Sequence, residues 1–266
     1  MHELPRITVV TPSFNQAVFL ERTICSVLNQ GYPNLEYIIV DGGSKDGSVE
    51  IIKKYEHRLA WWVSEPDGGQ TAAINKGLRR ATGDWVAWQN SDDVYLPGAL
   101  MQMAETARIA PNVDLILGDM QIIDANDNIV RGQRYVRPTY KALLAEGMVL
   151  TNQAAFWRRE LHDNIGWLDE TLQFGFDYEW FLRVLRVSDS VRHVPNFWGG
   201  LRYHDATKTS TCLSKFADEY CVILNGRTLP LWQKRLYQVR RLLLTLNYGH
   251  FDYVLLGILN RLGWRN

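Results

Sequence analysis

The chain has 266 residues, 46% of them hydrophobic and 12% aromatic, with 29 basic and 29 acidic side chains and a formal net charge of zero. This composition is typical of a folded protein with a sizeable core and does not favour nucleic-acid binding, because no excess of positive charge draws the chain toward phosphate backbones. No apolar run is as long as a membrane span, no signal peptide is evident, and the three cysteines match neither a zinc spacing nor a disulfide framework, so a cytoplasmic location is expected.

The first hundred residues alternate predicted strands and helices. Short β-branched or aromatic runs predict four strands, at 7–10, 37–40, 61–63 and 85–88. The segments between them have helical periodicity, at 17–30, 49–56 and 70–81. Such alternation is typical of parallel strands whose carboxyl ends line one crevice. We therefore expect the polar residues at the strand ends to converge, namely Thr11, Ser13, Asp41, Asp67, Asp92 and Asp93.

Two adjacent carboxylates, Asp92 and Asp93, follow the fourth predicted strand. They repel each other, and a bound cation relieves the repulsion. Carboxylate oxygens suit hard divalent ions such as Mg²⁺ or Mn²⁺, which usually share their ligand shell with substrate phosphates. The pair therefore indicates a metal-dependent site for a phosphorylated substrate. The alternative is that one of the two acids caps a helix beginning near Pro97.

The second half of the chain is less regular. A strand is predicted at 114–117, a hairpin within 121–130 that turns at Asp127-Asn128, and an extended segment at 153–157. Helices are predicted at 139–147 and 177–187. No clear linker divides the chain into independent domains.

Six short motifs stand in order between Ile7 and His204. They are TPSFN at 11–15, DGGSKDGS at 41–48, DGGQ through NKG at 67–77, SDD at 91–93, an acid at 177 and RYH at 202–204. Each is weak alone, but together they resemble the family 2 inverting glycosyltransferases of GT-A fold. The resemblance implies an α/β fold, with a Rossmann-like, mostly parallel sheet flanked by helices and a C-terminal helical extension. It divides the chain into a catalytic domain at 1–225, with a nucleotide-binding half at 1–110 and an acceptor half at 111–225, and an amphipathic helical tail at 226–266.

The resemblance also implies an activity and its residues. The expected reaction transfers a sugar from a nucleoside-diphosphate donor, with UDP favoured, to a hydroxyl of a saccharide or lipid-linked saccharide, with inversion, in cell-surface polysaccharide or glycolipid synthesis. Asp177 is the expected general base, although the family often has Glu-Asp where this chain has Phe176-Asp177, so Glu179 is the fallback. Asp93 and His204 are the expected contacts of a divalent cation, Mn²⁺ or Mg²⁺. The expected nucleotide and donor contacts are Thr11, Pro12, Ser13, Asn15, Asp41, Gly42, Asp67, Gln70, Lys76, Asn90 and Asp92.

Several of these residues have a plain structural alternative. The run Asp41-Gly42-Gly43 fits a simple turn, Asp177 fits the cap of the helix that follows it, and Lys76 fits a solvated helix surface. Trp157 and Trp180 would stack on a sugar or, as is commoner, pack in the core. The segment 205–214, rich in Thr, Ser and Lys, is expected to close over the nucleotide.

The last forty residues have a different character. From Leu229 onward leucines recur at helical spacing with basic residues between them, and Asp252 is the one acid between 227 and 266. A basic amphipathic helix can lie on an anionic membrane, here the inner face of the cytoplasmic membrane. The alternative is that residues 229–266 pack on the catalytic domain or on a second copy in a homodimer.

Two other classes of protein compete with the enzyme expected here. One is a non-catalytic nucleotide-sugar-binding protein without a general base, which the presence of Asp92, Asp93 and Asp177 together disfavours. The other is a sugar-phosphate nucleotidyltransferase. Such enzymes tend to carry a Gly-rich, Arg-containing loop after the first strand, where this chain has TPSFN.

Overall fold

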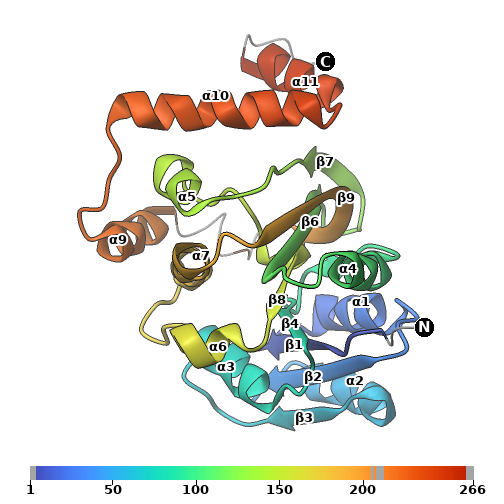
Figure 1. Cartoon of the computed structure of the whole chain (residues 1–266). Coiled ribbons are helices and arrows are strands. Elements are labelled where there is room, and N and C mark those ends of the chain that lie inside the picture. Colours follow the sequence, from blue (N-terminus) through green and yellow to red (C-terminus); the bar gives the residue numbers. More distant parts are fainter. Residues whose placement is uncertain (1–3, 205–206, 208–212, 262–266) are drawn as a thin grey trace.

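Nine strands of the described residues form one mixed sheet (Figure 1). The structure is a computed structural model that describes residues 4–204, 207 and 213–261. The strands are β1 Ile7–Ser13, β2 Leu35–Asp41, β3 Trp61–Ser64, β4 Trp85–Trp88, β5 Val94–Tyr95, β6 Leu115–Ile123, β7 Ile129–Gln133, β8 Ala155–Arg158 and β9 Val191–Arg202. Their order is β3-β2-β1-β4-β8-β6-β9-β5, with β7 beside β6.

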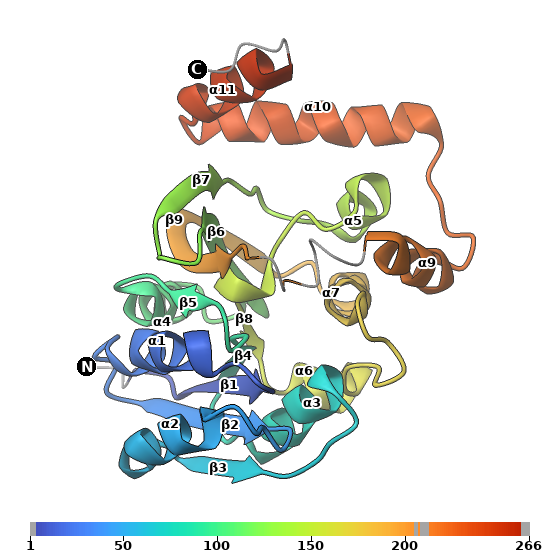
Figure 2. The same ribbon diagram turned by 180° about the vertical axis from the view of Figure 1, so that it is seen from behind.

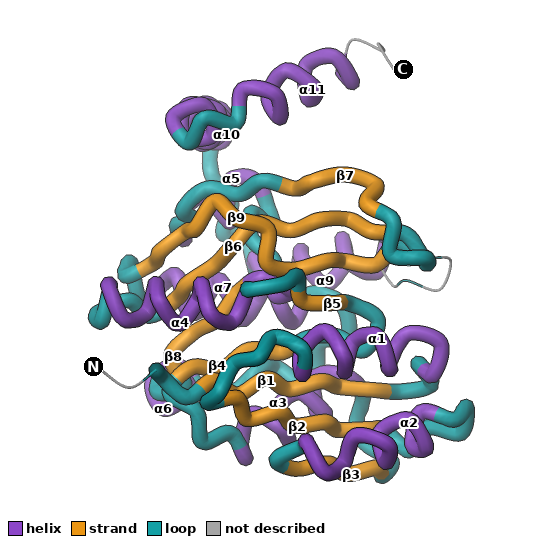
Figure 3. Tube along the Cα trace, turned by 90° about the vertical axis from the view of Figure 1, so that its right-hand side faces the viewer, coloured by secondary structure: helices purple, strands orange, loops and turns teal. Residues whose placement is uncertain are grey.

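Helices cover both faces of this sheet. They are α1 Ala17–Leu28, α2 Ser48–Tyr55, α3 Gln70–Arg80, α4 Ala99–Ile109, α5 Tyr140–Glu146, α6 Leu161–Ile165, α7 Phe176–Val187, α9 Leu213–Leu224, α10 Leu231–Asn247 and α11 Phe251–Arg261, with short 3-10 turns η1 Glu56–Arg58 and η2 Asn152–Ala154. Helices α1, α2 and α4 lie on one face, and α3, α6 and α7 on the other (Figure 3). Two hydrophobic clusters, one on each face, make up the core.

The first hundred residues have the predicted alternation of strands and helices. Strands β1, β2, β3 and β4 are all parallel, and every residue of β1 is buried because helices cover both faces of the sheet. Beyond β4 the sheet becomes mixed: β8 runs antiparallel to β4 and to β6, whereas β9 is parallel to β6. The sheet is thus parallel from β3 through β2 and β1 to β4, and mixed from β8 onward.

The predicted strand at 114–117 and the first arm of the predicted hairpin are one strand, β6. The hairpin to β7 turns where expected, because the Asp124 carboxylate accepts hydrogen bonds from the backbone N–H groups of Asn126 and Asn128, at 2.8 and 2.9 Å. β6 stays paired with β9 along its length by shifting register around Asp119. The long β6–β9 pair extends the sheet beyond β8.

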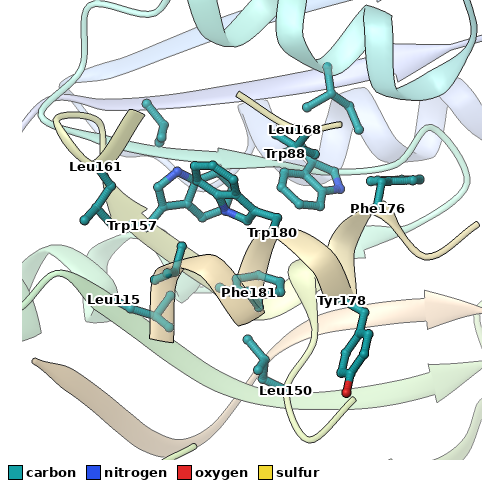
Figure 4. Packing of buried hydrophobic residues seen from close by; sticks show 14 of the residues in the cluster. Trp88, Leu115, Leu150, Trp157, Leu161, Leu168, Phe176, Tyr178, Trp180 and Phe181 are labelled. Carbon is teal, nitrogen blue, oxygen red and sulfur yellow. The ribbon is translucent and has the colours of Figure 1, made fainter. Parts of the chain in front are cut away.

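An aromatic cluster fills the space between α7 and the sheet (Figure 4). Trp157 and Trp180 are fully buried, and the ring of Trp157 lies 5.2 Å from Trp88 and 5.9 Å from Trp180. Core packing is therefore the role of both tryptophans, rather than stacking on a sugar. Trp88 and Phe176, whose rings lie 6.1 Å apart, connect this cluster to the cavity described below.

The C-terminal helices α10 and α11 lie beside the sheet domain, over α5 and β7 (Figure 2). Arg241 of α10 pairs with Glu146 at the end of α5, at 2.8 Å, and Tyr253 of α11 accepts a hydrogen bond from Gln133 of β7, at 3.1 Å. The segment 225–230 separates this pair of helices from α9. No helix in the described ranges has the length and apolar character needed to cross a bilayer.

Candidate active site

A cavity of about 350 Å³ opens at the carboxyl ends of β1 and β4 and extends to α7 and α9. The predicted site residues that border it are Pro12, Ser13, Asp67, Gln70, Asn90, Asp92, Asp93 and Asp177. Gln153 of η2, Leu201 of β9 and Phe216 of α9 also contribute to its lining. The structure therefore brings together strand ends and helix residues that lie up to 204 positions apart, from Pro12 to Phe216.

The acid pair lies in the turn that follows β4. Asp93 is 1% exposed. Its Oδ1 accepts a hydrogen bond from the backbone N–H of Arg202 (2.9 Å), and its Oδ2 accepts from the side-chain amides of Asn90 (2.9 Å) and Gln153 (2.7 Å). Burial, and after it the negative charge of Asp92, raises the pKa of Asp93 to about 7. Three donors thus fix the orientation of a carboxylate that has roughly four acceptor positions.

Arg202 and His204 support the same turn from β9 and the residues after it. The Arg202 guanidinium is fully buried, donates to the backbone carbonyl of Asp92 at 2.7 Å and pairs with Asp127 at 2.5 Å. His204 Nε2 lies 3.2 Å from Asp92 Oδ2, and its ring packs on Phe19 with 4.5 Å between centroids. His204 therefore contacts the acid pair through Asp92. Helix α4 is capped by Gly98, so the alternative in which either acid caps that helix is wrong.

Gly199 of β9 explains how Gln153 reaches Asp93. A Cβ at position 199 would lie 2.2 Å from the backbone oxygen of Gln153, closer than any real contact. Only glycine lets β9 approach η2 this closely. The side-chain amide of Gln153 is also held by Thr151, whose hydroxyl donates to the Gln153 Oε1.

The residues of this turn fit a hard divalent cation. Asp92 and Asp93 offer carboxylate oxygens, and His204 offers an imidazole nitrogen. Among the described residues, no cluster of three or more His, Cys, Asp or Glu side chains could hold a metal by itself. Mg²⁺ usually binds to one or two carboxylates and completes its shell with substrate phosphates and water. Burial, and after it the charge of Asp92, raises the pKa of Asp93, and a cation beside the carboxylate would offset both effects.

Asp177 borders the cavity from the first turn of α7. Its carboxylate is half-buried and accepts a hydrogen bond from the backbone N–H of Tyr178, at 2.7 Å. Burial first, and then the charge of Glu219, raises the pKa of Asp177 to about 6. The capping position of α7 is Gly175, so the alternative role of Asp177 as the N-cap is wrong. A carboxylate with this pKa is suited to accept a proton near neutral pH.

Glu179, the fallback base, is engaged elsewhere. Its two carboxylate oxygens accept hydrogen bonds from Nε and a terminal nitrogen of Arg183, one helical turn later, at 2.6 and 2.7 Å. It does not contribute to the cavity lining. Of the two acids on α7, Asp177 is thus the one that faces the cavity.

Glu219 of α9 positions Asp177, and sequence reasoning missed it. Its carboxylate accepts hydrogen bonds from three consecutive backbone N–H groups, those of Gln173, Phe174 and Gly175, at 2.9, 2.9 and 2.7 Å. These N–H groups directly precede α7, so Glu219 attaches α9 to the helix that carries the candidate base. A lone glutamate in an amphipathic helix is an ordinary surface residue, and no local pattern distinguished it.

Asp41 and Gly42 lie beside the cavity lining rather than in it. The Asp41 carboxylate is fully buried and accepts hydrogen bonds from the backbone N–H groups of Gly43 and Ser44 and from the hydroxyls of Ser44 and Ser64. These contacts favour the turn alternative for this motif. A Cβ at Gly42 would lie 3.2 Å from the Asp67 carboxylate, so glycine allows the two segments to approach.

Thr11, Asn15 and Lys76 also lie outside the lining. The Thr11 hydroxyl is buried and shares a hydrogen bond with the Tyr37 hydroxyl at 2.9 Å. Asn15 adopts a left-handed backbone (φ 51°), and its Oδ1 accepts a hydrogen bond from the backbone N–H of Lys45, linking the loops after β1 and β2. Lys76 pairs with Glu65 at 2.6 Å on the surface of α3, which agrees with the alternative of a solvated position on a helix. Most of the segment 205–214 lies outside the described residues.

Comparisons with known proteins show the family to which this chain belongs. The family model described as glycosyl transferase family 2 matches residues 8–167, which include the acid pair but neither Asp177 nor His204. An uncharacterized glycosyltransferase of Mycobacterium tuberculosis is 33% identical over 72% of this chain and 73% of its own length. The chain is therefore a glycosyltransferase by class, and it belongs to glycosyl transferase family 2.

Solved structures show the same fold. The Staphylococcus aureus protein TarS, residues 1–349 in complex with UDP-GlcNAc, has a TM-score of 0.68 at 19% identity, over 87% of this chain and 70% of that one. A mannosyltransferase of Pyrobaculum calidifontis, PcManGT, in complex with GDP-Man and Mn²⁺, has a TM-score of 0.62 at 18% identity, over 90% of this chain and 69% of that one. The fold is of the GT-A type, as expected.

Proposed function

We propose that this chain transfers a sugar from a nucleoside-diphosphate donor to an acceptor hydroxyl with inversion, with the help of a divalent cation. One observation carries the proposal: a single cavity is bordered both by the acid pair Asp92–Asp93 and by a separate carboxylate, Asp177, whose pKa is raised to about 6. Cation binding and proton acceptance are the two tasks that such a reaction divides between protein groups.

The acid pair is the proposed cation and diphosphate end of the cavity. A divalent cation bound there would offset the charge that develops on the leaving diphosphate. Asp93 is the proposed direct ligand, because its amide donors hold it in one orientation and leave an acceptor position for a cation. His204 would contact the cation or the diphosphate, and Asp92 the ribose or a metal-bound water.

The proposed donor contacts are the other polar residues that border the cavity at the ends of β1 and β4 and at the start of α3. We call this side of the cavity the nucleotide wall. Gln70, Asn90 and Asp93 form a connected row, in which the Gln70 amide donates to Asn90 Oδ1 at 2.9 Å and Asn90 donates to Asp93. Asp67 borders the cavity just before α3, and Pro12 and Ser13 border it at the end of β1. The row leads from the start of α3 to the acid pair, which is the course we propose for the nucleoside diphosphate.

Asp177 is the proposed general base. The acceptor hydroxyl oxygen forms a bond to the anomeric carbon while the bond from that carbon to the diphosphate oxygen breaks. The hydroxyl proton passes to the Asp177 carboxylate, and the electron pair of the broken bond leaves with the diphosphate. Attack from the face opposite the leaving group inverts the anomeric configuration, and one base is sufficient.

We propose a UDP-sugar as the donor. Support comes from the structural likeness to TarS, which was solved in complex with UDP-GlcNAc, although PcManGT of the same fold was solved in complex with GDP-Man. The acceptor is proposed to be a saccharide or lipid-linked saccharide used in cell-surface polysaccharide or glycolipid synthesis, on the resemblance of the motifs.

The test begins with melting curves in UDP, GDP, dTDP or ADP, each with Mn²⁺ and with EDTA. A ligand that binds only the folded state raises Tm by mass action. We expect UDP with Mn²⁺ to raise Tm and EDTA to abolish the shift. Slow hydrolysis of one UDP-sugar, measured as released UDP, would then identify the donor. No shift with any nucleotide in the presence of metal would contradict the proposal, and a shift with no turnover on any donor and acceptor would favour the binding-protein alternative.

A further inference from the structure

The outward face of α10 and α11 is apolar. Its exposed large side chains are Leu231, Trp232, Leu236, Val239, Leu242 and Leu243 in α10 and Phe251, Leu255, Leu256 and Ile258 in α11. Trp232 is 65% exposed and Phe251 63%. A contiguous apolar surface of this extent is rare on a soluble monomer and indicates a binding surface. We call these ten side chains the apolar face.

The side of α10 that meets the sheet domain is the polar one. Arg241 pairs with Glu146, and Arg240 donates to the backbone carbonyl of Arg137 at 3.3 Å. The ring of Tyr248, which follows α10, packs on His193 of β9 with 5.2 Å between centroids. An amphipathic helix normally turns its apolar stripe toward the core. In α10 the arrangement is reversed, so the part of the chain that the structure describes leaves the apolar face uncovered.

Charge indicates what covers this face. From 227 to 261 the chain has the basic residues Arg227, Lys234, Arg235, Arg240, Arg241 and Arg261 and the single acid Asp252. Arg235 is exposed among the apolar side chains themselves. The partner should therefore be apolar within and anionic at its surface.

The charged side chains that line a groove beside α10 are also mainly basic. It is lined by Lys141 of α5, Arg186 of α7 and Arg240 of α10, with Asp189 as the acid in its lining, and it opens next to Leu236 of the apolar face. Its volume is about 540 Å³. Three cations against one carboxylate, at the edge of an apolar surface, suit an anionic headgroup whose acyl chains lie against that surface.

We propose that the apolar face of α10 and α11 binds to the surface of an anionic phospholipid bilayer. The helices would lie in the interface, with the apolar face among the acyl chains and the basic side chains at the level of the headgroups. A second copy of this chain fits less well, because pairing two such faces brings two basic tails together. This inference does not depend on the proposed donor or mechanism.

The experiment is co-sedimentation of the full chain with vesicles. Vesicles of phosphatidylglycerol and of phosphatidylcholine are compared at low salt, and the anionic set is repeated at high salt. We expect the protein to pellet with the anionic vesicles and to do so less at high salt, which screens the attraction of basic residues to the surface. A protein that stays in the supernatant with anionic vesicles at low salt overturns the proposal.

Substitutions distinguish this face from any other apolar surface. The double variant Leu236→Gln with Leu243→Gln should lower the partition constant by at least about tenfold, since two leucines no longer enter the acyl region. The matched control, Val18→Gln with Ile109→Gln, removes two equally exposed apolar side chains on α1 and α4 and should bind as the wild type does. Equal loss in both double variants would contradict a specific face.

Sedimentation velocity without vesicles tests whether a second copy of this chain covers the apolar face instead. We expect a monomer for the wild type and for both double variants. A dimer that dissociates in the Leu236→Gln, Leu243→Gln variant would assign the apolar face to a second copy and overturn the membrane proposal. Because all four side chains are exposed, unchanged Tm values should show that each variant is folded.

Discussion

The two walls of the cavity are built in opposite ways. The nucleotide wall comes from consecutive strand–helix units, and its polar residues follow from the positions of β1 and β4 in a parallel sheet. The opposite wall, where we propose that the acceptor binds, is called the acceptor wall; it is assembled from η2, α7, β9 and α9, which lie far apart in the sequence. Single side chains hold it together: Gln153, Arg202 and Glu219 each connect two of these segments or join one to the acid turn. The acceptor wall should therefore respond more strongly to single polar substitutions than the nucleotide wall does.

The largest expected effect comes from Asp177→Asn. Loss of a general base should lower kcat by about 10³-fold while the Tm shift with UDP and Mn²⁺ is kept, because the nucleotide wall is intact. Glu179→Gln, two residues later, is the matched control and should retain most activity, since Glu179 pairs with Arg183. An active Asp177→Asn enzyme would show that Asp177 is not the general base.

Asp93→Asn tests the nucleotide wall at the buried carboxylate of Asp93. We expect the Mn²⁺-dependent part of the UDP stabilisation to disappear, with nucleotide affinity lowered by about 10- to 100-fold. The exposed acid Glu50 of α2 gives the control, Glu50→Gln, which should behave as the wild type does. Unchanged metal dependence in Asp93→Asn would exclude Asp93 as the ligand.

The pH dependence should follow the pKa of Asp177, which is raised to about 6. The base acts when deprotonated, so kcat/KM should fall by about tenfold per pH unit below 6. The folded state binds this proton more tightly than the unfolded state, so ionising Asp177 costs stability as the pH rises through the interval between about 4 and 6. Asp177→Asn should therefore melt at a higher temperature than the wild type at pH 8, and the difference should vanish near pH 4. A flat activity profile between pH 5 and 8 would argue against this base.

Glu219→Gln tests the attachment of α9 to α7. An amide cannot accept all three N–H bonds in the same geometry, so we expect a loss of about 1–3 kcal/mol in the free energy of unfolding, or roughly 5 °C in Tm. The acceptor KM should rise several-fold with UDP binding unchanged, and the acid limb of the pH profile should move to lower pH as the charge near Asp177 is removed. The neighbouring exposed residue provides the control, Asp218→Asn, which should show none of these changes.

The smallest expected effect is that of Lys76→Gln. Lys76 pairs with Glu65 where their side chains are 33% and 53% exposed, and such pairs contribute about 0–1 kcal/mol. UDP affinity should change by less than about twofold. A tenfold loss would place Lys76 on the nucleotide after all.

The contrast between the walls also decides what could be predicted from the sequence. Periodicity located the first four strands and their helices because each unit forms from neighbouring residues. The strand order β8-β6-β9-β5 could not be predicted, since it depends on pairings between segments such as Leu115–Ile123 and Val191–Arg202, whose partners no local pattern specifies.

The candidate site divides in the same way. Asp92 and Asp93 were found because two adjacent acids at a strand end are a local signal, and Asp177 because the motif order resembles a family. Glu219 and the buried roles of Arg202 and Gln153 were missed, because a buried hydrogen bond between distant residues leaves no spacing in the sequence. Asp41 has the pattern of a binding motif, but its carboxylate is used in its own turn.

Gly199 sets a constraint on how this enzyme can diverge. Because β9 touches the backbone of η2 there, a side chain at 199 would push Gln153 away from Asp93 and disturb both walls at once. Residues of α9 such as Phe216 border the cavity without touching the acid turn, so new acceptor preferences can evolve there while the cation end is preserved. Gly199, Gln153 and Asp93, by contrast, should be inherited together, as a unit in which a change at one position requires a change at the others.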